Sequence, residues 1–168
     1  MRNHEESNMQ KQCVAWFRAQ YPQYAMLLTH PINEGGKGTR VSGAIHKGEG
    51  TVAGVPDLLF FMPVYKAPLG YDEETRKQSG MVHGLGIEFK TAKGKQSQEQ
   101  KDFEHMFQAA GYKYVVVRSF EQFRLLINSW VGWAGIEERQ KIASAHVEIN
   151  QAAEQKEKER FYKIIGKK

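Results

Sequence analysis

The chain has 168 residues, and 24 Lys and Arg against 19 Asp and Glu give it a formal net charge of +5. This length suits one domain with a short appendage, and 40% hydrophobic residues exclude a wholly disordered chain. The single cysteine, Cys13, excludes an internal disulfide and a cysteine-based zinc site. No apolar run reaches the length of a membrane helix, and the polar first residues do not resemble a secretory signal. We therefore expect a cytoplasmic protein without membrane contact, whose basic surplus is compatible with a polyanionic partner or with an ordinary soluble surface.

The first third of the chain predicts a helix, a short strand and a long loop. Residues 4–20 repeat apolar side chains with helical spacing, and Pro22 ends this helix. Residues 24–29 form an apolar run that predicts a buried strand. Residues 31–54 are rich in Gly and Lys and predict a loop with at most two helical turns. A loop of this length inside a compact domain usually indicates function or mobility.

Three further segments predict strands. A Gly-Val-Pro-Asp turn at residues 54–57 leads into a buried strand at residues 58–62, and residues 63–80 predict a surface excursion. Residues 84–91 alternate apolar and polar side chains, which is typical of a strand. Residues 112–118 are almost continuously apolar, so we expect this strand to be central in the sheet.

The remaining segments predict helices. Ser97 and Gln100 have the spacing of a capping box, so a helix begins there and is expected to end at Gly111. Ser119 begins a second helix, whose large apolar side chains are more numerous than one small sheet face can cover. We therefore expect part of this helix to form a homodimer interface, unless its apolar residues fold back on the core. These residues are Phe120, Phe123, Leu126, Ile127, Trp130 and Trp133.

The order of these elements predicts a mixed α/β fold. A small mixed central sheet flanked by helices would occupy residues 1–135. Residues 136–168 are highly charged with sparse apolar side chains, which predicts a solvated helix or a frayed tail.

Three polar residues stand where a buried strand would ordinarily carry apolar ones. Asp57 directly precedes the strand at 58–62, and Glu88 and Lys90 project from the same face of the strand at 84–91. If these two strands are neighbours, both carboxylates converge with the Lys90 ammonium beside them. Two carboxylates form a hard-oxygen site suited to Mg²⁺, which polarises a phosphoryl oxygen and activates water. The opposing interpretation is that Glu88 and Lys90 only line the solvated face of an edge strand.

These segments resemble the PD-(D/E)xK nuclease superfamily and, within it, the virus-type replication-repair nuclease domain, VRR-NUC. The resemblance covers roughly residues 4–128 and rests on GVPD at 54–57, IEFK at 87–90, the Ser97-x-x-Gln100 helix start and VVVRS at 115–119. It implies a restriction-endonuclease-like core and phosphodiester cleavage that depends on Mg²⁺ or Mn²⁺, often on branched DNA. It also implies homodimeric, junction-resolvase-like assembly in phage-type replication or repair.

The resemblance also implies roles for individual residues. Asp57, Glu88 and the main-chain carbonyl of Phe89 would hold the metal, and Lys90 would assist the nucleophile. Gln100 would be a site residue. The capping box offers it a different role, a hydrogen bond back to the Ser97 N–H, and we expect one side chain to fill only one of these two roles. A glutamate of the first helix would face the site, and the spacing to Gln10 favours Glu6 over Glu5. His30-Pro31-Ile32-Asn33 resembles a His-x-Pro-Asn stretch of the family with the proline one residue early, which leaves the roles of His30 and Asn33 open.

The leading interpretation is thus a Mg²⁺-dependent DNA endonuclease. The alternatives are a nucleic-acid-binding module that keeps the fold without cleaving, and a charged interaction protein that acts through residues 136–168. Basic residues near the site are candidates for phosphate contact, although each is individually compatible with a solvated surface charge. These are Lys37, Arg40, Lys47, Lys93, Lys95 and Lys101.

Overall fold

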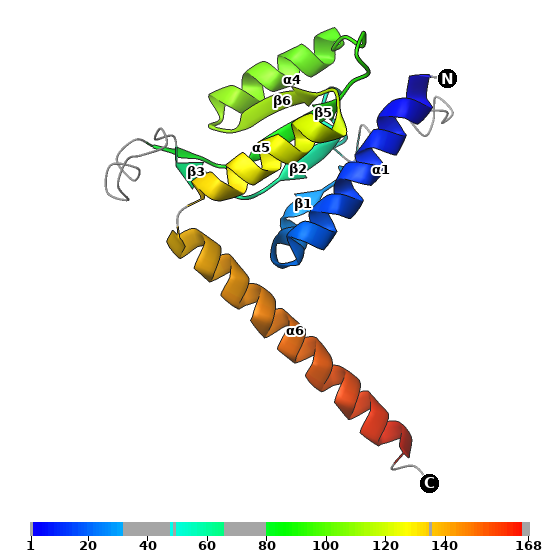
Figure 1. Ribbon diagram of the computed structural model, residues 1–168, viewed down its shortest axis with the longest axis vertical. Helices are drawn as coiled ribbons and strands as arrows, with labels where there is room; N and C mark the ends of the chain where they lie inside the picture. Colours follow the sequence, from blue (N-terminus) through cyan, green and yellow to red (C-terminus); the bar gives the residue numbers. More distant parts are fainter. Residues whose placement is uncertain (1, 32–47, 49, 66–79, 135, 166–168) are drawn as a thin grey trace.

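A computed structural model describes residues 2–31, 48, 50–65, 80–134 and 136–165. Its centre is a four-stranded sheet in the order β1-β2-β5-β6, in which β5 and β6 are parallel and the other pairs antiparallel. The predicted small mixed sheet flanked by helices is therefore confirmed (Figure 1). The elements in chain order are α1 (Arg2–Gln20), η1 (Pro22–Leu27), β1 (Leu28–Thr29), β2 (Leu58–Phe60), β3 (Val64–Tyr65), β4 (Met81–Val82), β5 (Leu85–Phe89), α4 (Gln98–Ala109), β6 (Lys113–Val117), α5 (Phe120–Trp133) and α6 (Ile136–Ile165).

Helices cover both faces of the sheet. On one face α1 and α5 pack against each other and against the sheet, where Phe17 contacts Phe60 and Phe89 contacts Phe123. On the other face lies α4, where a Cβ added to Gly86 would come within 2.9 Å of the Phe107 ring. Side chains alternate along β5, so Glu88 shares the α4 face with Gly86.

Cys13 belongs to the core between α1 and the sheet. Its side chain is fully buried, and this burial raises the pKa of its thiol to about 12. A thiol with this pKa stays protonated at neutral pH, as is typical of a cysteine that is part of the core.

The segment at residues 24–29 differs from the prediction of one strand. Residues Pro22–Leu27 form a 3-10 helix, and only Leu28 and Thr29 pair with β2. Pro22 occupies the first turn of this helix, where its fixed φ suits the helical conformation and its missing N–H costs nothing. A short apolar run has no periodicity that separates a strand from a helical turn.

The apolar sequence of residues 112–118 predicts a central strand. The structure instead places this strand, β6, at the edge of the four-stranded sheet. β5 occupies the interior position between β2 and β6, and all five of its residues are buried. β6 is apolar because α4 contacts one face of it and α5 the other. Coverage by two helices therefore produces the same sequence pattern as a central position.

The two predicted loops are described only in part. Residues 32–47, which include the expected helical turns, lie outside the described residues, as do residues 66–79 of the predicted surface excursion. The ends of that excursion form a two-stranded ladder, in which β3 pairs with β4 through Val64 and Val82.

The six apolar side chains of α5 that predicted a dimer surface pack against the core instead, whereas Leu125 on the same helix is exposed. Phe123, Ile127 and Trp130 are buried, and the Trp130 indole donates to the Met62 carbonyl at 2.9 Å. Phe120, Leu126 and Trp133 are partly buried against the same core. The stack of α1 on α5 provides the cover that one sheet face could not.

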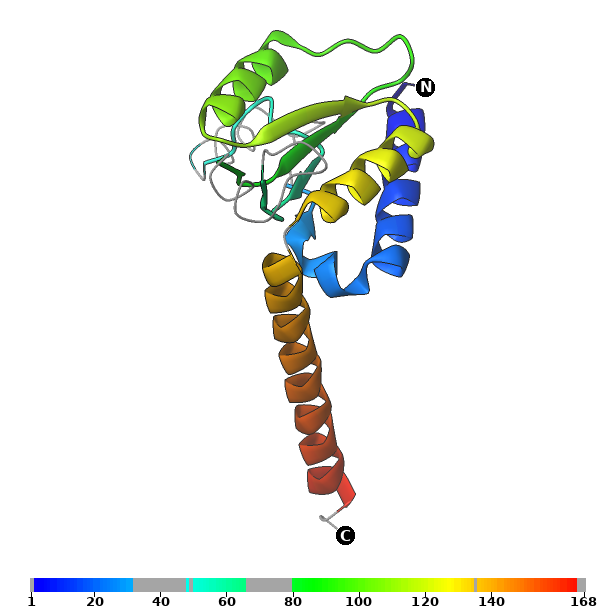
Figure 2. The same ribbon diagram turned by 60° about the vertical axis from the view of Figure 1, so that its left-hand side comes forward.

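α6 extends away from the other elements (Figures 1 and 2). Its first turns contact η1, and Ile142 is partly buried against the core. From Val147 to Ile164 every residue is exposed. The charged segment is thus a solvated helix over residues 136–165, and the boundary between domain and tail near residue 135 stays a prediction. Within the described residues, no helix is long and apolar enough to span a membrane.

Candidate active site

Asp57 is positioned by the turn that leads into β2. Gly54 has φ +86°, and a Cβ at this position would lie 2.1 Å from the Glu99 carbonyl oxygen, so the turn at 54–57 packs closely against the first turn of α4. The carboxylate of Asp57 accepts a hydrogen bond from the Phe89 main-chain N–H at 2.7 Å. Strand pairing ends at Leu58 and Ile87, so the register continues with Asp57 beside Glu88.

Glu88 is the one charged residue among the buried side chains of the described chain, with 2% exposure. Its Oε1 accepts from the Lys90 ammonium at 2.5 Å and from the Gln100 amide at 2.5 Å. Its Oε2 accepts a longer bond from the Tyr114 hydroxyl at 3.4 Å. A buried carboxylate that accepts from three donors does not fit the opposing interpretation, in which Glu88 only lines the solvated face of an edge strand.

Gln100 fills both of the roles that the sequence suggested were exclusive. Its Oε1 accepts from the Ser97 main-chain N–H at 3.0 Å, while its Nε2 donates to Glu88. The Ser97 hydroxyl in turn accepts from the Gln100 N–H at 3.3 Å, which completes the capping box of α4. The expectation of one role or the other was wrong, because the amide presents its acceptor and its donor to opposite sides. The helix start therefore orients Gln100 toward Glu88.

The two carboxylates are held where ionisation is unfavourable. Burial raises the pKa of Asp57, with a smaller contribution from Glu6, although the Phe89 N–H and Lys90 act in the opposite direction. Burial also raises the pKa of Glu88, and the neighbouring charge of Asp57 raises it further against the effect of Lys90 and Gln100. Two carboxylates with raised pKa values at one place are typical of a functional site, since a structural pair would gain nothing from this repulsion.

We expect Asp57→Asn to stabilise the metal-free protein at neutral pH. Because the folded pKa of Asp57 is raised, the stability that its protonated form contributes is present below the ordinary value of 3.8 and is lost as the pH rises through the folded value. Asparagine cannot ionise, and its Oδ1 can still accept from Phe89. The melting temperature in EDTA should rise by roughly 2–4 °C for each kcal/mol of desolvation cost and repulsion that the substitution relieves.

The gain should shrink as the pH is lowered through the raised pKa toward 3.8. Asp102→Asn, at an exposed position of α4, is the matched control and should leave the melting temperature almost unchanged. A lower melting temperature for Asp57→Asn at neutral pH would contradict the raised pKa of Asp57 in the folded protein.

The first helix contributes Glu6 to the neighbourhood of the site. Glu6 Oε1 accepts from the Thr91 main-chain N–H at 2.8 Å, directly after Lys90, whereas Glu5 is exposed. Gln10, one turn along α1, donates to the Asp57 carbonyl at 3.4 Å. Glu6 therefore lies near the acidic pair and influences the pKa of Asp57, but its hydrogen bond is to the main chain beyond Lys90.

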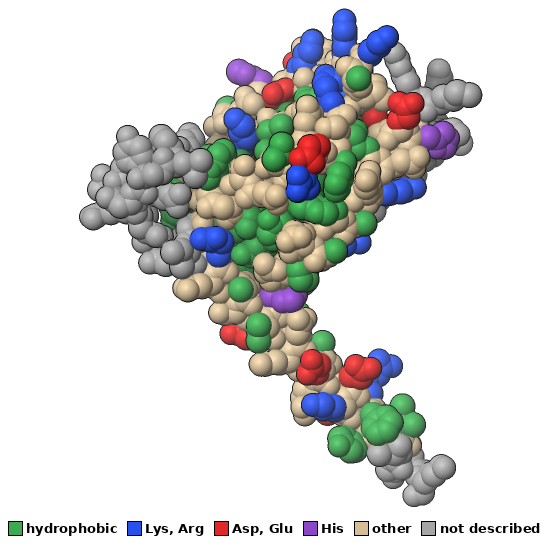
Figure 3. Space-filling view, viewed as in Figure 1, with side chains coloured by type: hydrophobic (Ala, Val, Ile, Leu, Met, Phe, Trp, Pro, Cys, Tyr) green, Lys and Arg blue, Asp and Glu red, His purple; other side chains and the backbone are tan. Residues whose placement is uncertain are grey.

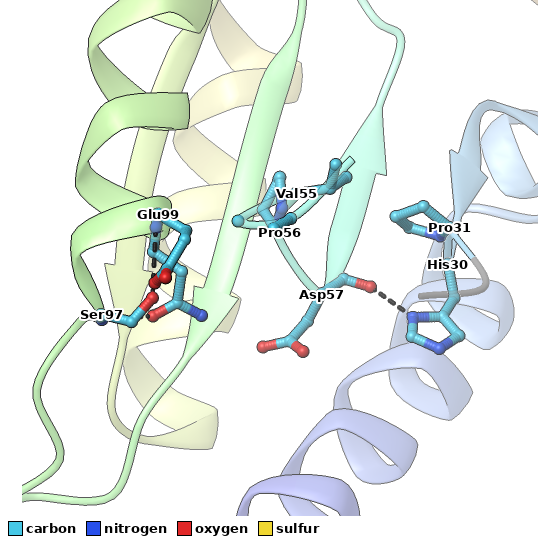
Figure 4. A pocket seen from close by; sticks show the side chains of 10 residues that line it. His30, Pro31, Val55, Pro56, Asp57, Ser97 and Glu99 are labelled. Atoms are coloured by element: carbon cyan, nitrogen blue, oxygen red, sulfur yellow. Dashed lines mark hydrogen bonds between the residues drawn. The ribbon is translucent and has the colours of Figure 1, made fainter. Parts of the chain in front are cut away.

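A pocket of about 270 Å³ opens beside Asp57. Figure 4 shows His30 and Pro31 on one side of Asp57, and Ser97 and Glu99 on the other. The His30 ring contacts the Asp57 carbonyl through Nδ1 at 2.6 Å. His30, whose role the sequence left open, therefore lies at the site, while Asn33 is outside the described residues.

The basic candidates for phosphate contact are only partly placed. Lys93 and Lys95 are exposed in the loop between β5 and α4, and Lys101 is exposed in the first turn of α4. In Figure 3, Lys and Arg side chains gather over α4 and the loop that precedes it. Lys37, Arg40 and Lys47 lie outside the described residues.

Two contacts of the site were missed in the sequence. Tyr114 on β6 reaches Glu88, and Arg118 at the end of β6 donates to the carbonyls of Thr91 and Gly94. Tyr114 pairs with Gly86, two residues before Glu88, and so faces the same side of the sheet. The alternation of side chains along β6 could have predicted the contact of Tyr114 with Glu88 only if the pairing of β5 with β6 had been known.

The donor set of the site fits a magnesium ion. Within the described residues no group of three His, Cys, Asp or Glu side chains converges, so the candidate site offers a pair of carboxylates and not a closed set of side-chain ligands. Mg²⁺ is bound in proteins through one or two carboxylates and keeps several waters, whereas structural zinc needs a closed set of four ligands. Asp57 uses Oδ2 for Phe89, and no described residue donates to its Oδ1.

Comparison with known proteins shows the fold. No family model and no curated protein sequence matches the chain. Among solved structures, a protein named "VRR_NUC domain protein" is similar with a TM-score of 0.57 and 21% sequence identity. The similarity covers 77% of this chain and 89% of that one. The chain therefore has a mixed α/β fold of the kind found in that VRR_NUC domain protein.

Proposed function

We propose that the protein is a nuclease, specifically a divalent-metal-dependent DNA endonuclease that hydrolyses phosphodiester bonds. One observation carries the proposal: the antiparallel pairing of β2 with β5 brings Asp57 beside the buried Glu88, with the Lys90 ammonium bonded to Glu88. The similarity to the VRR_NUC domain protein supports the same class of activity.

The residues of the site take the following roles. Asp57 and Glu88 hold Mg²⁺ or Mn²⁺ together with the Phe89 carbonyl, and the metal when bound polarises the phosphate and lowers the pKa of water. Lys90 lies beside Glu88 and can orient the attacking water or stabilise charge on the phosphate. Gln100 and Tyr114 fix the Glu88 carboxylate by hydrogen bonds to its two oxygens.

The substrate is DNA, contacted through Lys93, Lys95 and Lys101, and we propose a branched structure such as a four-way junction in phage-type replication or repair. Resolving such a junction needs two symmetric cuts, and a two-fold dimer would supply two sites. The six apolar residues of α5 no longer support this dimer because they are buried or partly buried against the core. The proposal of a dimer is therefore supported only by the two-fold symmetry of a four-way junction.

A direct test uses the wild-type chain on linear duplex, flap and four-way junction DNA. We expect cleavage with Mg²⁺ or Mn²⁺, none in EDTA, and binding with little cleavage in Ca²⁺, whose larger coordination shell positions water poorly. Binding without cleavage under every divalent metal would contradict the nuclease and favour a nucleic-acid-binding module. Neither cleavage nor binding would favour an interaction protein that acts through α6.

A further inference from the structure

The turn at residues 91–94, which directly follows Lys90, is held from two sides. Gly94 N–H donates to the Thr91 carbonyl at 3.0 Å and closes the turn. From α1, Glu6 accepts the Thr91 N–H at 2.8 Å. From the end of β6, Arg118 Nη1 donates to the carbonyls of Thr91 at 2.5 Å and Gly94 at 2.9 Å. One guanidinium thus spans both ends of the turn.

Arg118 stands on rigid elements. It follows the last residue of β6, and its own N–H donates to Gln122 Oε1 at 2.8 Å, at the start of α5. Ser119 caps the same helix by accepting from the Gln122 N–H at 3.2 Å. The position of the guanidinium is therefore set by the junction of a strand and a helix, not by the turn that it binds.

The turn is packed directly on Lys90. A Cβ added to Gly94 would lie 3.1 Å from Thr91 Oγ1 and 3.3 Å from both the Lys90 Cβ and Glu6 Oε1, so a larger residue would have to displace these neighbours. Lys90 N–H also donates to the Val117 carbonyl at 3.0 Å, one residue before Arg118. The Lys90 main chain is thus anchored to β6 on one side, and the turn contacts its side chain at Cβ on the other, so a displaced turn would act on the Lys90 side chain.

We propose that Arg118 is a positioning residue: it holds the 91–94 turn and through it places the Lys90 ammonium against Glu88. This inference rests on the proposed nuclease function for its effect on catalysis. Arg118 is exposed, so the opposing role is a direct contact with a DNA phosphate. The two roles differ in what they change, because positioning acts on the rate of the chemical step and a phosphate contact acts on affinity.

The test compares Arg118→Met and Arg118→Lys with the wild type. Arg124→Met is the matched control, since Arg124 is an exposed arginine on α5 that bonds to Glu121 within the same helix. Three quantities are measured: the single-turnover cleavage rate at saturating protein, the dissociation constant for the same DNA at several salt concentrations, and amide hydrogen exchange in the 91–94 turn without DNA or metal.

We expect Arg118→Met to lower the single-turnover rate by about 10- to 100-fold, the scale of a small misplacement of a catalytic group. Its DNA affinity should stay within about twofold, with the salt dependence unchanged. Amide exchange at Gly94 should become faster. Arg118→Lys should recover part of the rate, since an ammonium can donate to a carbonyl but lacks the fixed fork of donors. Arg124→Met should match the wild type in all three.

An unchanged rate in Arg118→Met would overturn the proposal, and so would weaker binding with a salt slope reduced by about one, which indicates a phosphate contact. A wild type that cuts no substrate would overturn the proposed function instead. If the wild type is inactive, the amide exchange measurement still tests whether Arg118 holds the 91–94 turn. Unchanged exchange in Arg118→Met would show that it does not.

Discussion

Replacing Glu88 by Gln is expected to lower the single-turnover cleavage rate by about 10³-fold or more. The carboxylate supplies one of the two charges for the metal, and losing several kcal/mol of transition-state stabilisation corresponds to a change of this size. Glutamine has nearly the same shape, its Oε1 can still accept from Gln100 and Lys90, and its Nε2 can donate to the Tyr114 hydroxyl oxygen, so the variant should fold. Its affinity for DNA should be equal or slightly higher, because binding depends on cationic contacts and the variant removes a negative charge.

The matched control is Glu121→Gln, an exposed carboxylate that pairs with Arg124 on the surface of α5. It changes the net charge equally and should leave both cleavage and affinity unchanged, since exposed ion pairs contribute little. If Glu88→Gln cuts DNA at a rate close to that of the wild type, Glu88 does not hold a catalytic metal.

Replacing Lys90 by Met is expected to lower cleavage by about 10²- to 10³-fold, the cost of losing one preorganised donor at the reacting phosphate. Metal binding, measured by calorimetry at neutral pH, should persist because the ammonium is not a ligand. Lys90 lowers the pKa of Glu88, so its loss should shift the acidic limit of metal binding to higher pH. Lys90→Arg should rescue poorly, because guanidinium is planar, bulkier and cannot deprotonate.

Lys113→Met is a suitable control, because Lys113 is an exposed lysine at the opposite end of β6 from the site. It should cut DNA as the wild type does. Loss of metal affinity in Lys90→Met equal to that in Glu88→Gln would indicate that Lys90 only maintains the structure of the site.

The part of the site that sequence could predict depends on the period of two along a strand. Alternation at residues 84–91 places Glu88 and Lys90 on one face, and a turn before a buried run places Asp57 at the start of its strand. The structure brings the three together because β2 and β5 are neighbours. Helical spacing in α1 leaves both Glu5 and Glu6 possible, and only the spacing to Gln10 that the family resemblance implies favours Glu6, which lies near the site while Glu5 is exposed.

The remaining features depend on pairings that no local pattern contains. Tyr114 and Arg118 contact the site only because β6 runs parallel to β5, and the order of strands is set by how the helices cover them. The apolar side chains of α5 were misinterpreted as a partner surface because α1 supplies their cover, where Trp16 packs against Phe120 and Phe123. The dual role of Gln100 needs the position of Glu88 relative to the start of α4.

The most direct measurement of the central claim is the anomalous scattering of Mn²⁺ in crystals of the wild-type protein, with crystals of Glu88→Gln as the comparison. We expect a peak bonded to the carboxylates of both Asp57 and Glu88 in the wild type, and its loss in Glu88→Gln. A crystal whose ordered Mn²⁺ binds elsewhere, with both carboxylates free of metal at saturating concentration, would show that the acidic pair is not the metal site.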